Sequence, residues 1–274
     1  MNNFIKLYKK EFMKDRKSFV ITLVIIIAMT LFLYSRIGYW TPGIPTFILA
    51  VAILGFSIAA FISSFDCMGD EWEHNNHYLM LSLPVRGRDM LGAKLAWFAT
   101  EFGTYILLLG ACTIVVLLGE ARGIGPVNNA LYSAITVAAW RTYGIMVVPV
   151  LYVLVATGVL ALSSYTVGST VKRLKFWVGA ISFIVPGGLL FYLSSIAMKA
   201  SPAWMHIEMP LADILAWPQI ESVLSDSDMV SVNLASFINS VVVGIDILAL
   251  LIWTAGLVGL FFMASWLLEN MVEA

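Results

Sequence analysis

Charged residues are scarce in this chain. Only 12% of its 274 residues are Asp, Glu, Lys or Arg, and 60% are hydrophobic, whereas a typical soluble domain is about 25% charged. This composition excludes an ordinary soluble domain and indicates an integral membrane protein. The formal net charge of −1 provides no overall attraction for nucleic acid, so we expect no nucleic-acid partner.

Motifs for cofactors and metals are also lacking. Two cysteines, Cys67 and Cys112, are too few for a disulfide framework and are expected to be free thiols. A Gly-x-x-x-x-Gly-Lys-Ser/Thr phosphate loop is absent, so this chain is not expected to bind ATP by that motif. His74 and His77 stand beside acidic residues, but not as His-Glu-x-x-His. We favour solvated polar residues there, and predict no catalytic residue, cofactor or metal.

Long apolar runs are what the sequence has instead. Each is close to the ~20 residues that a helix needs to cross the hydrocarbon. They lie near 18–34, 46–65, 96–119, 145–170, 176–198 and 241–268. The sequence therefore predicts an all-α membrane protein in which residues 1–274 form a single domain with six transmembrane helices. No cleavable signal peptide is expected before the first of them.

Residues 1–17 read as an amphipathic helix. Phe4, Ile5, Tyr8 and Phe12 share one face, and lysines occupy the other. This pattern is typical of an interfacial helix in the headgroup layer, which we prefer to a merely cationic tail. If the N-terminus is cytosolic, the inner segments hold twelve Lys and Arg residues and the outer segments four. This asymmetry predicts that both termini are cytosolic.

Two outer segments are larger than plain loops. Residues 120–144 contain the apolar stretch 131–140, which is too short to cross the membrane. The extracellular segment 199–240 contains a similar stretch at 209–217, followed by an acidic patch. We predict short extracellular helices in both, between spans three and four and between spans five and six.

A few residues inside the predicted spans are unusual. Glu101 and Asp246 are carboxylates in apolar runs, where such groups usually face protein or water. A translocation pathway or proton site competes with structural hydrogen bonding; we favour the structural role for Glu101 and leave Asp246 open. Pro186-Gly187-Gly188 predicts a kinked or interrupted fifth span. That site is either a static bend or a gating hinge.

The charged interruption at 66–94 organises the first half of the chain. Asp70, with Glu73 three residues later, has the pattern of a helix start. An apolar patch follows and ends at Pro84. A segment this short is not a domain, and we interpret it as a contact for another protein. Its distinctive residues are Asp70-Glu71, Leu79-Met80-Leu81-Ser82-Leu83-Pro84-Val85-Arg86 and Gly92-Ala93-Lys94.

With the amphipathic start and six spans, this segment resembles the type-2 permeases of ATP-binding-cassette (ABC) exporters. The family usually has a Gly-Thr pair where Asn75-Asn76-His77 stands here. The resemblance implies a cytosolic coupling segment at 66–94 that contacts a separate ATPase subunit, which would hold ATP and magnesium. The implied ATPase-coupling residues are Asp70, Glu71, Glu73, Tyr78, Leu79, Leu81, Leu83, Pro84 and Arg86.

The resemblance also implies a second permease chain, identical or a sister subunit, in the plasma membrane of a bacterial cell. It does not identify the substrate, although the apolar spans fit peptides, lipids or hydrophobic compounds. One alternative is an intramembrane protease or lipid-modifying enzyme that uses Glu71, Glu73, His74 and His77. Another is a proton-coupled secondary transporter that uses Asp246 or Glu101, although no inverted repeat supports it.

Overall fold

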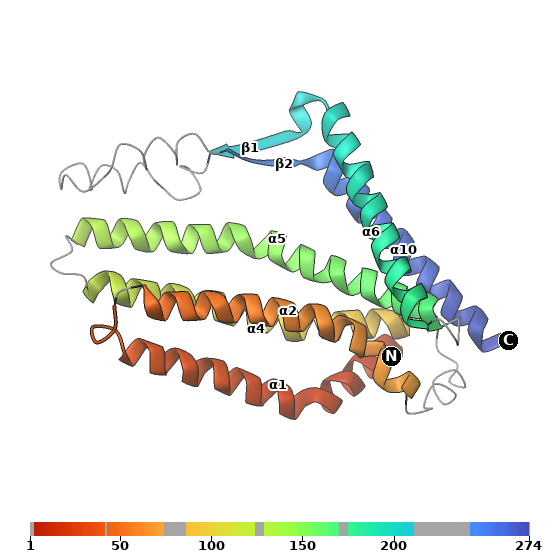
Figure 1. Ribbon diagram of the computed structural model, residues 1–274, viewed down its shortest axis with the longest axis horizontal. Helices are drawn as coiled ribbons and strands as arrows, with labels where there is room; N and C mark the ends of the chain where they lie inside the picture. Colours follow the sequence, from red (N-terminus) through yellow and green to blue (C-terminus); the bar gives the residue numbers. More distant parts are fainter. Residues whose placement is uncertain are drawn as a thin grey trace.

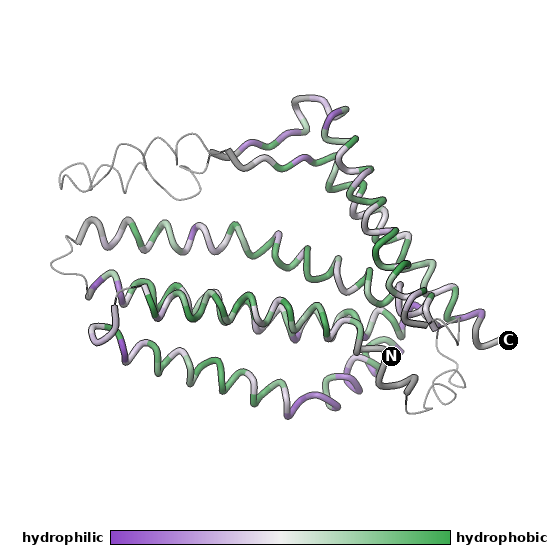
Figure 2. Tube along the Cα trace, in the orientation of Figure 1, coloured by the Kyte–Doolittle hydropathy of each residue, from purple (hydrophilic) through white to green (hydrophobic). Residues whose placement is uncertain are grey.

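Long helices account for most of the described chain. The computed structural model describes residues 3–41, 43–73, 86–123, 129–169, 175–210 and 242–273. The helices are α1 (Asn3–Ser35), α2 (Ile44–Glu73), α4 (Gly87–Gly123), α5 (Asn129–Ser169), α6 (Lys175–Ala200) and α10 (Ile247–Glu273) (Figure 1). All 6 are long and apolar enough to cross a membrane, and Figure 2 shows hydrophobic residues along them. The prediction of a mainly helical membrane protein with six helices long and apolar enough to span is confirmed.

Several helices extend well beyond their apolar runs. α2 continues to Glu73, so Asp70 lies inside this helix. The sequence pattern predicted that Asp70 starts a new helix, and this prediction is wrong. α5 is 41 residues long and includes 131–140. The separate short helix expected in that outer segment is therefore wrong. Polar residues continue a helix whenever its backbone hydrogen bonds are kept, whereas hydropathy marks only the part inside hydrocarbon.

The N-terminal residues and the first span form one helix, α1, which Figure 1 shows bending toward the N-terminus. Tyr8, Phe12 and Phe19 meet the ring of Trp97 on α4 edge-on, with ring centroids 6.1, 5.3 and 5.7 Å apart. Aromatic pairs favour this arrangement. Much of the face that was expected to enter the headgroup layer therefore packs on α4. The interfacial position of residues 1–17 stays a prediction.

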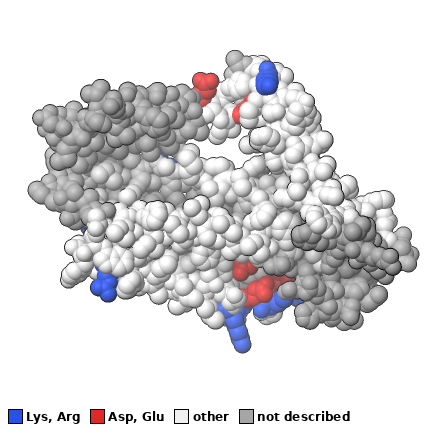
Figure 3. All heavy atoms as spheres, in the orientation of Figure 1, with Lys and Arg blue, Asp and Glu red and all other residues white. Residues whose placement is uncertain are grey.

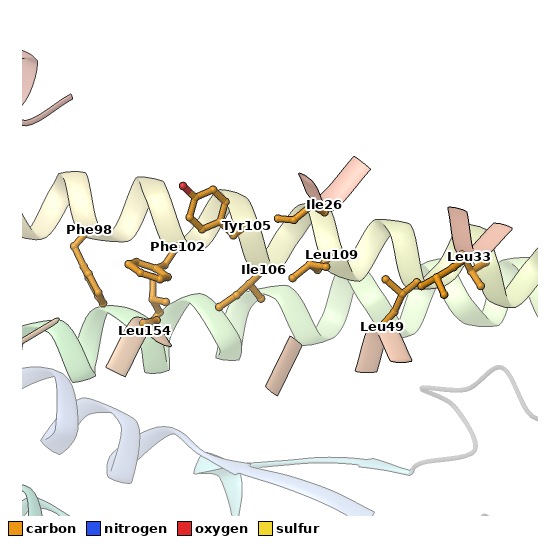
Figure 4. Packing of buried hydrophobic residues seen from close by; sticks show 11 residues of the cluster. Ile26, Leu33, Leu49, Phe98, Phe102, Tyr105, Ile106, Leu109 and Leu154 are labelled. Carbon is orange, nitrogen blue, oxygen red and sulfur yellow. The ribbon is translucent and has the colours of Figure 1, made fainter. Parts of the chain in front are cut away.

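The main hydrophobic core joins α1, α2, α4 and α5. Figure 4 shows how its side chains interleave between these helices. Its buried residues are Ile26, Leu33, Leu49, Ala60, Phe98, Phe102, Tyr105, Ile106, Leu109, Val116 and Leu154. Because α5 also packs on the remaining two helices, it connects the two parts of the molecule.

α6 and α10 pack closely together, and both pack on α5 through a second buried cluster, which includes Leu160, Leu190 and Leu257. At Gly256 a Cβ atom would lie only 2.1 Å from Leu190 Cδ2. A larger residue here would have to displace the end of the Leu190 side chain, and small residues often allow such close contact between membrane helices. Gly256 thus gives α10 a close contact with α6, whereas the neighbouring Gly259 has open space beside it.

Between α6 and α10 the structure describes the base of a β-hairpin. A short 3-10 helix, η1 (Ala203–Met205), leads into β1 (His206–Pro210), which pairs antiparallel with β2 (Val242–Asp246). The expected helix at 209–217 is wrong at its start, because Met209 and Pro210 belong to β1; the rest of it lies outside the described residues. The sixth helix begins at Ile247, not at 241, because β2 occupies the preceding apolar residues.

Two carboxylates tie helix ends to neighbouring helices. Near the end of α4, Glu120 accepts hydrogen bonds from the Gly43 backbone N–H (3.2 Å) and the Thr46 hydroxyl (2.6 Å) at the start of α2. Near the end of α10, Glu269 accepts one from the Gly87 N–H (2.9 Å) at the start of α4. The first N–H groups of a helix lack partners within it, so each carboxylate caps another helix and fixes its position.

Candidate functional site

The predicted ATPase-coupling residues fall mostly at the limit of what the structure describes. Asp70, Glu71 and Glu73 lie on the last turns of α2, where the backbone alone is described. Arg86 is exposed directly before α4. The coupling residues outside the described parts of the chain are Tyr78, Leu79, Leu81, Leu83 and Pro84.

Glu101 is half-buried on α4 and takes part in a local network. Its Oε1 atom accepts a hydrogen bond from the Tyr105 hydroxyl one turn further along (3.2 Å). On the same helix, Lys94 lies 3.6 Å from Glu11 of α1, with both side chains buried. Tyr105 belongs to the main core, whereas Asp246 is the last residue of β2, directly before α10. The structure does not join Glu101 and Asp246 into one pathway, and the favoured structural role of Glu101 fits its contacts.

The Pro186-Gly187-Gly188 stretch lies within α6, which continues without a break from Lys175 to Ala200. The interrupted form of the fifth span is therefore wrong. Pro186 has no N–H to donate, so one helical hydrogen bond is missing here. A kink or hinge at this position stays a prediction.

Asp246 is the best-defined polar site in the described residues. It is the last residue of β2 and is 7% exposed. Its Oδ1 accepts the Ala249 backbone N–H (2.8 Å), so it caps the N-terminus of α10. Its Oδ2 accepts the Ser201 hydroxyl (2.5 Å) and lies 3.1 Å from His206 Nδ1. The Ser201 hydrogen bond, followed by the Ala249 one, lowers the pKa of Asp246 below its usual 3.8.

Ser201, His206 and Asp246 have the residue types of a hydrolytic triad but not its geometry. In a triad the imidazole stands between the serine and the carboxylate, which do not bond to each other, and histidine takes the serine proton. Here Ser201 Oγ lies 2.9 Å from His206 Nε2 but gives its only proton to Asp246. The hydroxyl is therefore not activated as a nucleophile. The cluster instead fastens the hairpin to the ends of α6 and α10.

A cavity of about 380 Å³ opens beside Asp246. It lies between α5 and the α6–α10 pair, below β2 in the view of Figure 1, and Figure 3 shows the surface hollowed below the hairpin. Its lining residues are Tyr152, Val153, Ala156, Thr157, Leu160, Ser194, Met198, Gly244, Ile245, Asp246, Ala249, Leu250 and Trp253. The described residues thus line the cavity with apolar groups and one charged group, and its size falls within the range of ligand pockets.

Sequence reasoning missed Ser201 and His206, because neither stands in a recognisable motif and both reach Asp246 only through the hairpin. One available signal was the position of Asp246 immediately before an apolar helical run, which is typical of an N-cap. Within the described residues, no group of three or more His, Cys, Asp and Glu side chains could hold a metal ion. His74 and His77 lie outside those residues.

Comparison of the chain with protein-family models, with curated proteins and with solved structures gave no match.

Proposed function

We propose that this chain is the membrane permease subunit of an ABC exporter, driven by a separate ATPase subunit. The observation that carries the proposal is the segment 66–94, with its acidic start, apolar patch, Pro84 and following basic residues. The six apolar helices support it, because they provide the number of spans that such a permease needs.

The length of α2 supports a contact outside the membrane. The apolar run predicted from the sequence ends at Phe65 and is followed by Asp66, whereas the helix continues to Glu73. These eight further residues, at 1.5 Å each, extend about 12 Å along the helix axis. A soluble partner would therefore meet the segment clear of the hydrocarbon. In this proposal Asp70, Glu71 and Glu73 supply the charged contacts, and the apolar patch supplies the buried area.

The start of α4 provides a route from the segment to the spans. A Cβ atom on Gly87 would lie 2.7 Å from the Ser265 backbone oxygen, so α4 touches α10 directly at this point. Glu269 strengthens the contact by capping Gly87. A partner that moves the segment would displace α4 and α10 together, since the two ends are joined by backbone contact. This is the coupling that an ATP-driven permease needs.

In this proposal the active unit holds two permease chains and two ATPase subunits in a bacterial plasma membrane, with both termini cytosolic. The twelve-to-four asymmetry of basic residues supports that orientation, and Figure 1 shows both ends of the chain at one end of the helix bundle. ATP and magnesium would bind only to the partner. No described contact favours the enzyme or the proton-coupled transporter over this proposal.

The test is purification of the tagged chain from its own cells, identification of any ATPase subunit that co-purifies with it, and measurement of ATP turnover. Glu71→Ala and Leu81→Asp should leave the permease inserted but release the ATPase and abolish stimulated turnover. Losing one charged, buried interface contact costs on the order of 2–5 kcal/mol, which is roughly 30-fold or more in affinity. Glu208→Ala is the matched control, because it removes an exposed carboxylate from the hairpin.

The enzyme alternative predicts a different pattern. Under it, His74→Ala and His77→Ala would be the inactivating changes, and a chelator would reproduce their effect. If Glu71→Ala and Leu81→Asp retain and stimulate the ATPase as the wild type does, the coupling role of this segment is wrong.

A further inference from the structure

We propose that the cavity between α5, α6, α10 and β2 binds a lipophilic organic cation whose charge is quaternary or delocalised. This binding site does not depend on the proposed ATPase coupling, because it is formed by the described residues of one chain. Its features are the shape and lining of the cavity, the single carboxylate at its wall and the aromatic rings beside it.

The lining of the cavity selects an apolar ligand. Ten of its residues lie on α5, α6 and α10, and most carry hydrocarbon or sulfur side chains, including Leu160, Met198 and Leu250. Burial of apolar ligand surface against such residues is favourable in proportion to its area. A strongly hydrated ligand would lose its water here without receiving hydrogen bonds in return.

The sign of the charge is set by Asp246, the one charged residue among the described residues that line the cavity. Its lowered pKa keeps it ionised at neutral pH. The carboxylate lies at the cavity wall, close enough to attract a cation inside the cavity. An anionic ligand of the same size is repelled by the same group, so the cavity discriminates between charges.

The kind of cation follows from the hydrogen bonds that Asp246 already makes. Ser201, Ala249 and His206 occupy its oxygens, which leaves little acceptor capacity for a primary ammonium with three N–H donors. A quaternary or delocalised cation needs no hydrogen-bond acceptor and is attracted only by the electrostatic field of Asp246. Tyr152 and Trp253 also line the cavity, and aromatic faces attract cations of this kind.

The test compares tetraphenylphosphonium with tetraphenylborate, two ions of nearly equal shape and opposite charge. Binding of each labelled ion is measured on the full chain in phosphatidylcholine nanodiscs at pH 8, and empty nanodiscs are subtracted. We expect saturable binding of tetraphenylphosphonium and none of tetraphenylborate above the blank.

Variants locate the binding. Asp246→Asn keeps an N-cap side chain at the start of α10, since Asn and Asp cap helices about equally well. It should weaken tetraphenylphosphonium binding about tenfold or more, the scale of one lost ion attraction near a protein surface. Glu208→Gln removes an exposed carboxylate of β1 that does not line the cavity, and should leave binding unchanged. Ala156→Phe fills the cavity from α5 and should abolish binding.

The proposal is overturned if both ions bind equally and a neutral detergent displaces both, because the cavity would then be a site for uncharged lipid. It is also overturned if Asp246→Asn and Glu208→Gln weaken binding to the same extent, or if Ala156→Phe folds and still binds. Since no ATPase is present in the measurement, none of these outcomes bears on the coupling proposal.

Discussion

The ion pair between Glu11 and Lys94 tests whether the N-terminal part of α1 is held by α4. The two side chains are 7% and 2% exposed, and Lys94 Nζ lies 3.6 Å from Glu11 Oε1. Glu11→Ala would leave the buried ammonium without this carboxylate. Breaking a buried pair from one side typically costs 3–5 kcal/mol. Because 3.6 Å exceeds ordinary hydrogen-bond length, we expect the lower end, about 3 kcal/mol.

Unfolding in mixed detergent and SDS micelles, followed by tryptophan fluorescence, measures this cost. Lys9→Ala is the matched control, since Lys9 is an exposed cation on the same helix, and it should change the unfolding free energy by less than about 0.5 kcal/mol. The double variant Glu11→Leu with Lys94→Met should recover most of the loss, because apolar replacement of a buried pair is often neutral or stabilising. The recovery separates a broken ion pair from general damage to the helix.

Equal stability of Glu11→Ala and Lys9→Ala would refute the reasoning. It would mean that the first turns of α1 leave α4 in a bilayer and lie in the headgroup layer, as the amphipathic pattern of residues 1–17 predicts. A loss of about 3 kcal/mol in Glu11→Ala, restored in the double variant, would place them on α4.

Three further predictions concern other contacts. Gly256→Leu should destabilise the packing of α6 on α10 by roughly 1–3 kcal/mol in the same unfolding assay, and Leu190→Ala in the same chain should relieve part of it, because a Cβ at Gly256 would meet Leu190 at 2.1 Å. Since the folded pKa of Asp246 is lowered, its stabilisation is complete above the ordinary value of 3.8 and is lost as pH falls through the folded value; the difference in unfolding free energy between wild type and Asp246→Asn should therefore shrink on going from pH 6 to pH 3. In a cysteine-free background, Lys199→Cys should react with an impermeant thiol reagent from outside intact cells and Glu73→Cys should not; the reverse would invert the orientation.

Hydropathy predicted the spans because it measures what a bilayer requires, an apolar stretch of sufficient length. It underestimated the lengths of α4 and α5, because both helices continue into polar residues at one or both ends. Their ends depend on partners that are distant in sequence, such as Glu269, which caps Gly87 across 182 residues. No local pattern contains that information, because a capping carboxylate on another helix leaves no mark on the residues that it caps.

Asp246 shows how the same measure can misplace a residue. The apolar residues on both sides of it made one continuous run from 241 to 268, so it was assigned to the inside of the sixth span. The chain instead pairs those first residues with β1, in a register that sets Asp246 opposite His206. Pairing satisfies the backbone groups as a helix would, and only the strand partner, more than thirty residues earlier, decides between the two.

The position of α10 relates the two proposals physically. Its last turns touch the start of α4 through Glu269 and Ser265, while its first residue follows the carboxylate beside the cavity. The helix has 27 residues, about 40 Å at 1.5 Å each, and its contact with Leu190 at Gly256 makes α6 move with it. If a partner displaces the start of α4, the α6–α10 pair shifts against α5, and that boundary is where the cavity lies. The same displacement would then change the volume offered to a bound cation.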